Sequence, residues 1–409
     1  MPAQQRMRVG IVTREYPPEV YGGAGVHVEY LTAALASHAS VEVHCFGAPR
    51  SSPLVHGTYQ PWAALEGGGP HVAALRHMST DLAVVPALEG VDVVHTHTWY
   101  ANLAGHLAKL CYGIPHVATS HSLEPLRPWK AEQLGGGYAL SSFCERTALE
   151  AADAIIAVSE QMRRDVLASY PAVAAERVHV IHNGIDPDEY RPDSGTDVLE
   201  RHGIDPARPS VAFVGRITRQ KGVPHLLDAA AHFAPGTQLV LCAGAPDTPE
   251  LGAEVREAVA ALRAAGRVDV RWIEEMLPRA DVVQILSHAT VFVCPSIYEP
   301  FGLVNVEAMA CGDEVAASAV GGIPEIVLEG ETGHLVRFEP GDDPFGSPAD
   351  PEAFARALAA RVNDLVADPA RARSYGEAGR RRVVEEFSWA SVAERTMALY
   401  RALTGTAAG

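Results

Sequence analysis

The sequence is short of positive charge. Among its 409 residues, 33 Lys and Arg face 50 Asp and Glu, which gives a formal net charge of −17. Because a phosphate backbone attracts basic surfaces, this balance argues against nucleic acid as the main partner. It also disfavours docking on a membrane of anionic lipid, which needs clusters of Lys and Arg. Any phosphate-bearing ligand must therefore be held by a few local cations and by backbone amides.

Paired cysteines and long apolar runs are also missing. The six cysteines occur singly, without a Cys-x-x-Cys pair. This spacing is typical of small core residues in a reducing compartment and not of a disulfide framework or a zinc site. No apolar run reaches the ~18 residues of a membrane span, and the polar first six residues do not resemble a signal peptide. We therefore expect a cytoplasmic protein whose folded part starts near Met7.

The remaining composition is that of a globular protein with about two domains. Strand-like and helix-like stretches alternate along the chain, which predicts an α/β fold with parallel sheets covered on both faces. The segment 50–70, rich in Gly, Pro and Ser, is predicted to be a loop, and 371–403 to be helical. The predicted strands are 7–12, 41–46, 91–95, 116–119, 154–158 and 178–181 in the first half, and 211–214, 239–242, 268–272, 291–294, 314–317 and 334–336 in the second.

Two carboxylates follow the predicted strand 291–294. Glu299 lies in the strand-to-helix loop, and Glu307 lies about two turns into the helix that follows. Because open α/β folds bind small molecules at the carboxyl ends of their strands, both side chains could reach one ligand there. Their separation suits the hydroxyls of a sugar nucleotide better than a metal ion. The alternative is a βα junction with solvated carboxylates.

Each half has an unusual first loop. Gly22 and Gly23 precede a helix, so their backbone could approach a phosphate, although a simple turn explains them equally well. In the second half, Gly215-Arg-Ile-Thr-Arg-Gln-Lys-Gly222 directly follows a strand. Arg216 and Lys221 in this loop favour phosphate binding over the alternative of solvated surface cations.

Histidines mark a third site. His121 follows the predicted strand 116–119, where it could contact a ligand or serve as a structural residue. His95 and His97 lie on one face of another strand end. A metal site would need a third ligand at suitable spacing, and none is visible in the sequence, so we expect no metal.

Together these residues resemble the retaining glycosyltransferases of family 4, which have the GT-B fold. The likeness runs from Met7 to Trp389 and is closest to the short glycogen-synthase-like enzymes of that family. The longer glycogen and starch synthases fit less well, because three of their motif positions differ here, including an aromatic residue in place of Glu307. The motifs that carry the likeness are Gly22-Gly23, Asn183-Gly-Ile-Asp186, the Arg216 and Lys221 loop, Glu299 with Glu307, and Gly321-Gly-Ile-Pro-Glu325.

The resemblance implies two Rossmann-like parallel-sheet domains facing across a cleft. Residues 1–190 would form the acceptor-side domain and 191–384 the nucleotide-sugar domain, with a C-terminal helix in 385–409 crossing back to the first. The implied reaction moves glucose from ADP-glucose, with retention of configuration and without a cofactor or metal. The implied acceptor is a sugar phosphate, glucose 1-phosphate, or the end of an α-glucan. The oligomeric state is left open, with a homodimer as one option.

The resemblance also implies roles for single residues. His121 and Glu299 would be the catalytic residues, and Glu307 would accept hydrogen bonds from the ribose. A phosphorylated acceptor needs cations in the first half, and we expect Arg127 and Lys130 to supply them. The remaining implied contacts are Arg216, Lys221 and the amides of Gly22 and Gly23 on the donor diphosphate, and the amides of Phe301, Gly302 and Leu303 on the transferred sugar.

One segment departs from the family. Asp313 and Glu314 stand where most relatives have small and apolar residues. We expect these carboxylates to point to solvent, although donor affinity would suffer if they faced the diphosphate.

Two other functions are consistent with the same motifs. A mannosyl- or glycosyltransferase with an inositol or lipid acceptor is disfavoured by the acidic charge and the lack of a basic amphipathic helix. A non-catalytic sugar-nucleotide sensor is disfavoured by the presence of His121 with both glutamates.

Overall fold

A computed structural model describes residues 6–131, 135–244, 246–343 and 345–405. The chain divides into two compact units. The N-terminal unit comprises Met1–Gly184 with Trp389–Gly409, and the C-terminal unit comprises Ile185–Ser388. The predicted extension before Met7 lies outside the described residues except for Arg6, as do the last four residues of the chain.

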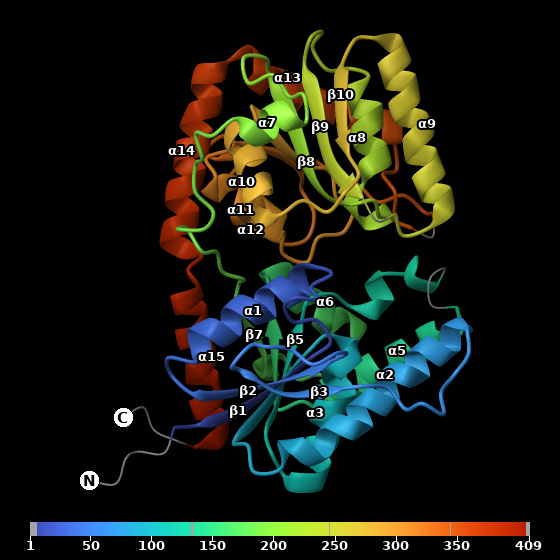
Figure 1. Cartoon of the computed structure of the whole chain (residues 1–409), viewed down its shortest axis with the longest axis vertical. Coiled ribbons are helices and arrows are strands. Elements are labelled where there is room, and N and C mark those ends of the chain that lie inside the picture. The colour runs from blue at the N-terminus through green and yellow to red at the C-terminus, as the bar shows by residue number, and fades with distance from the viewer. Residues whose placement is uncertain (1–5, 132–134, 245, 344, 406–409) are drawn as a thin grey trace. The chain divides into compact units, whose positions relative to one another are not determined.

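The described part of the N-terminal unit has a seven-stranded parallel sheet in the order β3-β2-β1-β4-β5-β6-β7 (Figure 1). Its strands are β1 (Arg8–Thr13), β2 (Ser40–Phe46), β3 (Val55–Tyr59), β4 (Val93–His97), β5 (His116–Ser120), β6 (Ala154–Ala157) and β7 (Val178–Val180). Its α-helices are α1 (Gly23–Leu35), α2 (Pro70–Val84), α3 (Trp99–Tyr112), α5 (Gly137–Ala151), α6 (Glu160–Ser169) and α15 (Trp389–Thr404), and its short 3-10 turns are Val85–Leu88, Glu124–Leu126 and Ala175–Arg177.

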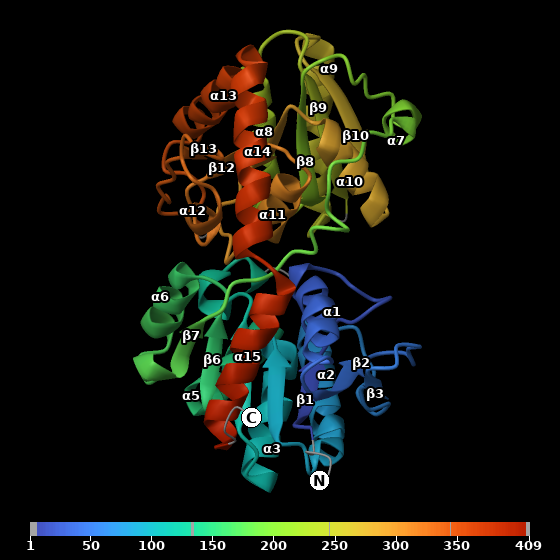
Figure 2. The ribbon, with the colours of Figure 1, turned by 90° about the vertical axis from the view of Figure 1, so that its left-hand side faces the viewer.

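Helices cover both faces of this sheet. On one face, α1 and α15 lie side by side, as Figure 2 shows, and their apolar residues pack with alternate residues of the strands, such as Val9 and Ile11. On the other face, α2 and α3 pack with Val12 and Val94. Neighbouring strand residues point to opposite faces, so apolar runs such as Val9–Val12 serve both layers.

The described part of the C-terminal unit has a six-stranded parallel sheet in the order β10-β9-β8-β11-β12-β13. Helices α8, α9 and α13 pack on one face, and α7 and α10 contribute to a core on the other. The strands are β8 (Ser210–Arg216), β9 (Gln238–Gly244), β10 (Asp269–Ile273), β11 (Val291–Cys294), β12 (Val315–Ser318) and β13 (Gly333–Val336). The helices are α7 (Asp197–Arg201), α8 (Val223–Ala230), α9 (Pro249–Ala265), α10 (Arg279–His288), α11 (Leu303–Ala310), α12 (Ile323–Ile326), α13 (Pro351–Ala367) and α14 (Pro369–Glu386), with a 3-10 turn at Arg219–Lys221.

These sheets confirm the predicted α/β class with two parallel-sheet, Rossmann-like units, and one local prediction is wrong. Strand β3 lies within the segment predicted to be a loop. It is a five-residue edge strand that contains Gly57, and no residue of β3 is buried. Such a strand lacks the apolar alternation by which strands are recognised, and its pairing with β2 forms it.

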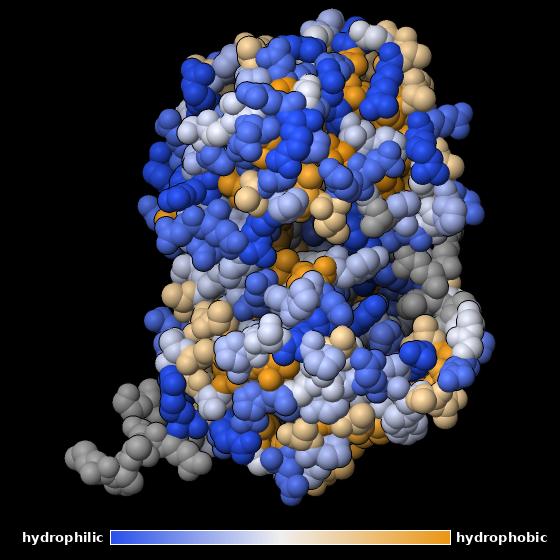
Figure 3. Space-filling view, in the orientation of Figure 1, coloured by the Kyte–Doolittle hydropathy of each residue, from blue (hydrophilic) through white to orange (hydrophobic). Residues whose placement is uncertain are grey.

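The hydropathy of the surface and of the helices agrees with the globular composition of the sequence. Hydrophilic residues predominate on the face drawn in Figure 3, with hydrophobic ones scattered among them. In the part of the chain that the structure describes, no helix has the length and apolar character needed to cross a membrane.

Candidate active site

Two loops meet at the carboxyl edge of the C-terminal sheet. Because parallel strands end at the same edge, the loops after β8 and β11 are neighbours. The amide of Ile297 donates to the carbonyl of Gln220 at 2.9 Å. Gly222 has a φ of +64°, and a Cβ atom there would lie 2.0 Å from the carbonyl oxygen of Pro295. A glycine is therefore needed for the close approach that brings Lys221 to Glu299.

Lys221 and Glu299 form an ion pair. Lys221 Nζ lies 2.7 Å from Glu299 Oε2, and the hydroxyl of Ser296 donates to the same oxygen at 3.1 Å. Burial lowers the pKa of Lys221, but Glu299 and Cys294 together raise it by more, so the net pKa is raised and the ammonium stays charged. The structure thus joins the residue predicted for the diphosphate to the one predicted for the sugar.

Arg216, at the end of β8, is held in the same way. Its Nη1 lies 3.1 Å from Asp247 Oδ1, and the Asp247 side chain is 9% exposed. Both cations predicted for the diphosphate are therefore oriented by carboxylates. Fixed charges of this kind can bind an anion without rearranging, because their positions are already set. Their role at the donor stays a prediction.

Helix α11 carries the remaining predicted donor contacts. It begins at Leu303 after Gly302, whose φ of +113° favours glycine, and Phe301 is buried. Glu307 lies in the middle of the helix, near the Tyr190 hydroxyl, which lowers the pKa of Glu307. Burial raises the pKa of Glu307, against the opposing effects of Tyr190 and of the Arg279 charge.

The expectation for Asp313 and Glu314 is wrong. Their side chains are buried, with exposures of only 2% and 4%. They directly precede β12, so they lie at the amino end of that strand, whereas the Arg216 loop follows the carboxyl end of β8 in the same parallel sheet. The two carboxyls therefore lie at the edge opposite the predicted diphosphate loop, and the strands separate their charge from it. Burial raises the pKa of both groups, to about 8 for Glu314.

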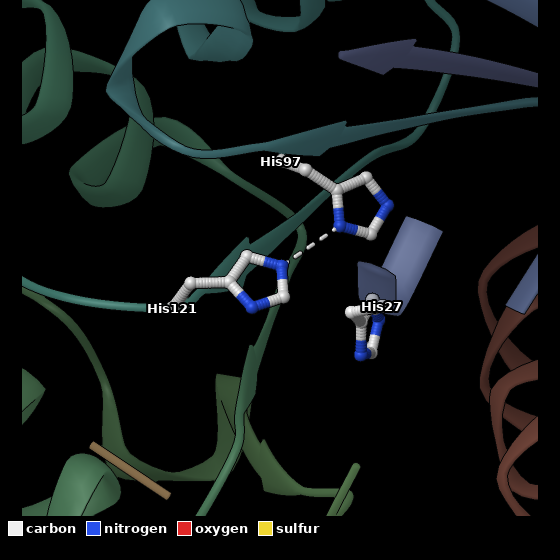
Figure 4. Close-up of side chains that lie close together, drawn as sticks. All are labelled: His27, His97 and His121. Atoms are coloured by element: carbon white, nitrogen blue, oxygen red, sulfur yellow. Dashed lines mark hydrogen bonds between the residues drawn. The ribbon is translucent and has the colours of Figure 1, made fainter. Parts of the chain in front are cut away.

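Three histidines converge in the N-terminal unit (Figure 4). His97 ends β4, His121 follows β5, and His27 projects from α1. A hydrogen bond of 3.1 Å joins His97 Nδ1 to His121 Nε2, and the rings of His27 and His121 meet edge to face at 4.7 Å. His27 Nδ1 donates to the amide oxygen of Asn183 at 2.8 Å, which leaves the lone pair of His27 on Nε2.

The histidine cluster of His27, His97 and His121 is uncharged at neutral pH. Burial lowers the pKa of His27 to about 4 and lowers the pKa values of His97 and His121 well below the ordinary value. Neutral imidazoles can hydrogen-bond a sugar hydroxyl. Their ligand atoms lie within 4.8 Å of one another, so the cluster also supplies the third nitrogen ligand that the sequence did not reveal for His97. That the protein uses no metal ion stays a prediction.

Gly22 and Gly23 lie at the start of α1, where Gly22 is the N-terminal cap. The amides of Tyr21 and Gly22 both donate to Glu15 Oε2 at 2.8 Å. The Glu15 carboxylate therefore takes the position that the prediction gave to a donor phosphate. In this conformation the Gly22 amide is engaged within the N-terminal unit.

The two residues predicted for an acceptor phosphate follow β5. Arg127 is largely buried; its Nη1 donates to the Ser122 hydroxyl at 2.9 Å and lies 3.9 Å from Glu124 Oε1. Arg127 Nε is buried and has no hydrogen-bond partner among the described residues. Lys130 is partly exposed, and directly follows the buried Trp129.

Sequence reasoning missed the supporting partners of the site. His27 and Asn183 are 156 positions apart, and Tyr190 lies far from Glu307 in sequence. No local pattern links such pairs. Asn183 belongs to a motif that was recognised, so it could have been singled out, but its partner could not.

The chain is similar to known glycosyltransferases over nearly its whole length. Residues 21–189 match the family described as Glycosyltransferase Family 4, and residues 196–382 match Glycosyl transferases group 1. The α-maltose-1-phosphate synthase of Mycolicibacterium smegmatis is 59% identical, over 97% of this chain and 99% of that one. That of Mycobacterium tuberculosis strain H37Rv is 55% identical with the same coverage.

A solved structure shows the same fold. The sucrose-phosphate synthase of Thermosynechococcus elongatus superimposes with a TM-score of 0.78 and 27% identity, over 98% of this chain and all of that one. Its likeness agrees with two Rossmann-like units of the GT-B type, and with the transferase motifs of the site. The chain is therefore a GT-B hexosyltransferase and belongs to the glycosyltransferase family that contains the α-maltose-1-phosphate synthases.

Proposed function

We propose that this protein transfers glucose from ADP-glucose to the 4-hydroxyl of glucose 1-phosphate in the cytoplasm, with retention of configuration. The products are ADP and α-maltose 1-phosphate. The observation that carries the proposal is the 2.7 Å pair of Lys221 and Glu299, beside Arg216 at the carboxyl edge of a parallel sheet. The full-length kinship with α-maltose-1-phosphate synthases supports the choice of substrates.

The reaction exchanges one bond for another. The bond from the glucose anomeric carbon to the diphosphate oxygen breaks, and that carbon bonds to the acceptor oxygen. The hydroxyl proton goes to the departing diphosphate. Negative charge grows on the diphosphate as the bond breaks, so Lys221 and Arg216 stabilise the transition state more than the ground state. We propose that these two cations replace a metal ion in this role.

The other site residues orient the sugar and nucleotide. In the proposal, the Glu299 carboxylate and the amides of Phe301, Gly302 and Leu303 hold the transferred glucose, and Glu307 accepts from the ribose. His121 offers a neutral imidazole to a sugar hydroxyl. Its orientation is supported by the hydrogen bond to His97.

The experiment is product analysis with purified enzyme. We expect release of ADP together with a phosphodisaccharide from ADP-glucose and glucose 1-phosphate, and much slower turnover with UDP-glucose or GDP-mannose. Activity should be unchanged after treatment with EDTA. A product found only with glycogen as acceptor would replace the proposal with glucan elongation, and loss of activity in EDTA that Mg²⁺ or Zn²⁺ restores would contradict the metal-free role of Lys221.

A further inference from the structure

We propose that Arg14 and Arg76 form an anion subsite in the N-terminal unit that binds the phosphate of a sugar phosphate. The identity of that sugar phosphate as the acceptor rests on the proposed function. These arginines are additional to Arg127 and Lys130, and no sequence motif pointed to them.

The two arginines line one pocket of about 500 Å³. The pocket lies at the carboxyl edge of the N-terminal sheet, where Arg14 directly follows β1 and Gly47 directly follows β2. Arg76 and His77 come from α2. A volume of this size is typical of small-molecule sites, and the carboxyl edge is where parallel sheets bind their ligands.

Among the described residues, neither arginine forms an ion pair with a carboxylate. Within the described residues, the contact of Arg14 is with the face of the Tyr100 ring, 4.4 Å from its centroid, and the hydrogen bond of Arg76 goes to the carbonyl of Leu65 at 3.0 Å. Two carboxylates also line the pocket, but neither forms an ion pair with Arg14 or Arg76 among the described residues. Glu15 accepts from backbone amides, and Glu19 pairs with Arg50 at 3.0 Å.

This contrasts with the predicted donor site of the C-terminal unit. The protein carries 50 acidic residues against 33 basic ones, and the cations Arg216 and Lys221 each have a carboxylate partner. Two partly buried guanidinium groups without such a partner repel one another. A bound anion would remove that repulsion, and a guanidinium can bind a phosphate through two parallel hydrogen bonds.

The charges of Arg14 and Arg76 both act on the His77 ring. Burial, and after it the charges of Arg14 and Arg76, lower the pKa of His77 to about 3. Both guanidinium groups are therefore close to this ring, which stays neutral and can donate or accept a hydrogen bond. Arg14 and Arg127 both lower the pKa of Tyr100, which burial raises, so Arg127 faces the same region.

Aromatic groups make the pocket suitable for a sugar as well as for a phosphate. The His77 ring packs on Tyr100 at 4.7 Å and on Phe46 at 6.3 Å. Tyr21, which also lines the pocket, is 53% exposed. Aromatic surface packs against the apolar C–H faces of a pyranose. A neutral glucan end would supply no charge for the two arginines, so the subsite selects a phosphorylated acceptor.

The experiment compares Arg14→Gln, Arg76→Gln and the double variant with the wild type. We expect the KM for glucose 1-phosphate to rise about tenfold or more in each single variant, because each loses a charge-assisted hydrogen bond. The KM for ADP-glucose should stay within about twofold. Arg164→Gln is the matched control, because it removes one exposed arginine of the same unit whose hydrogen bonds, within the described residues, go to Gln161.

A binding measurement separates this inference from the proposed function. Calorimetric titration of the donor-free protein with glucose 1-phosphate, and with inorganic phosphate, should show saturable binding that the double variant lacks. If the wild type binds these anions but makes no phosphodisaccharide, the proposed function fails and the subsite stands. Equal binding by the wild type and the double variant overturns the subsite. Should Arg14→Gln fail to fold, Arg14→Lys retains the charge without the paired geometry and should still weaken binding.

Discussion

Glu314 is a buried carboxyl group that the fold keeps protonated. Its Oε1 has no hydrogen-bond partner among the described residues, and burial raises its pKa to about 8. In the unfolded chain this group ionises above its ordinary pKa of 4.5, so the folded protein binds one more proton between about pH 4.5 and 8. The free energy of unfolding therefore falls as the pH rises through this window.

The substitution Glu314→Gln should remove that dependence, because an amide has the shape of the protonated acid and does not ionise. We expect it to raise the free energy of unfolding at pH 7.5 by about 4 kcal/mol and to leave it nearly unchanged at pH 4.5. Urea unfolding at both pH values measures the difference. Glu352→Gln, at an exposed position of α13, is the control. An equal gain at both pH values would show that ionisation is not the cause.

Single residues also show where sequence reasoning stops. Arg216, Lys221 and Glu299 could be singled out because each follows a strand whose apolar pattern is plain, and strand ends meet at one edge. Their pairing with Asp247 and with each other depends on side-chain directions that no spacing reveals. The sequence also cannot tell a buried carboxyl from a solvated one. Asp313 and Glu314 interrupt an apolar run, and polarity alone assigned them to the surface.

The close approach of two loops is the element on which the donor site depends. Gly222→Ala would place a Cβ atom 2.0 Å from the carbonyl oxygen of Pro295 and would add the strain of a side chain at positive φ. The loop must then move away from β11 and carry Lys221 away from Glu299. We expect kcat/KM for ADP-glucose to fall about a hundredfold, the size of effect seen when a group that stabilises developing charge is misplaced.

Gly266→Ala is a well-matched control for this variant. Gly266 caps α9 in the same unit with the same φ of +64°, but its Cβ position has no atom within 4 Å. Gly266→Ala therefore carries the backbone strain without the clash. It should lower the melting temperature slightly and leave kcat/KM unchanged. If both variants lose activity equally, strain alone is responsible, and the contact with Pro295 does not position Lys221.

Elements were easier to predict than their contacts. The strand-and-helix alternation indicated both sheets, because buried parallel strands are continuous apolar runs. Strand β3 was not predicted, because it lies at an edge of the sheet and has little apolar character. The tail predicted to be helical over 371–403 is divided into α14 and α15 at Phe387 and Ser388, with neither Gly nor Pro at the break. Packing separates them: α14 contacts α11, and α15 packs on α1.

At the scale of the whole molecule, two sets of titratable groups have opposite effects on how the free energy of unfolding depends on pH. Burial lowers the pKa values of ten described histidines and raises those of six described carboxyl groups. The histidines are His27, His44, His77, His95, His97, His106, His116, His121, His179 and His225. The carboxyl groups are Asp81, Glu145, Asp165, Glu307, Asp313 and Glu314.

The signs of these shifts predict a stability maximum near pH 6.5. Below pH 6.5 the histidines become protonated in the unfolded chain but stay neutral in the folded protein. The free energy of unfolding therefore falls as the pH falls towards 4. The carboxyl groups act in the opposite direction, but they are fewer. Above about pH 7.5 the histidines are neutral in both states. Only the carboxyl groups then contribute, and the free energy of unfolding falls as the pH rises towards 8.

Urea unfolding at half-unit steps from pH 4.5 to 8.5 measures this profile. We expect the midpoint urea concentration to peak near pH 6.5 and to decline more steeply on the acid side, because more groups titrate there. His27→Asn should make the decline of the midpoint below pH 6.5 shallower, because it removes one histidine that is protonated only in the unfolded chain. A midpoint that rises steadily with pH would mean that the carboxyl groups ionise within the fold. The protein would then hold buried negative charge beside an already acidic surface, and the protonated state assigned to Glu314 would be wrong.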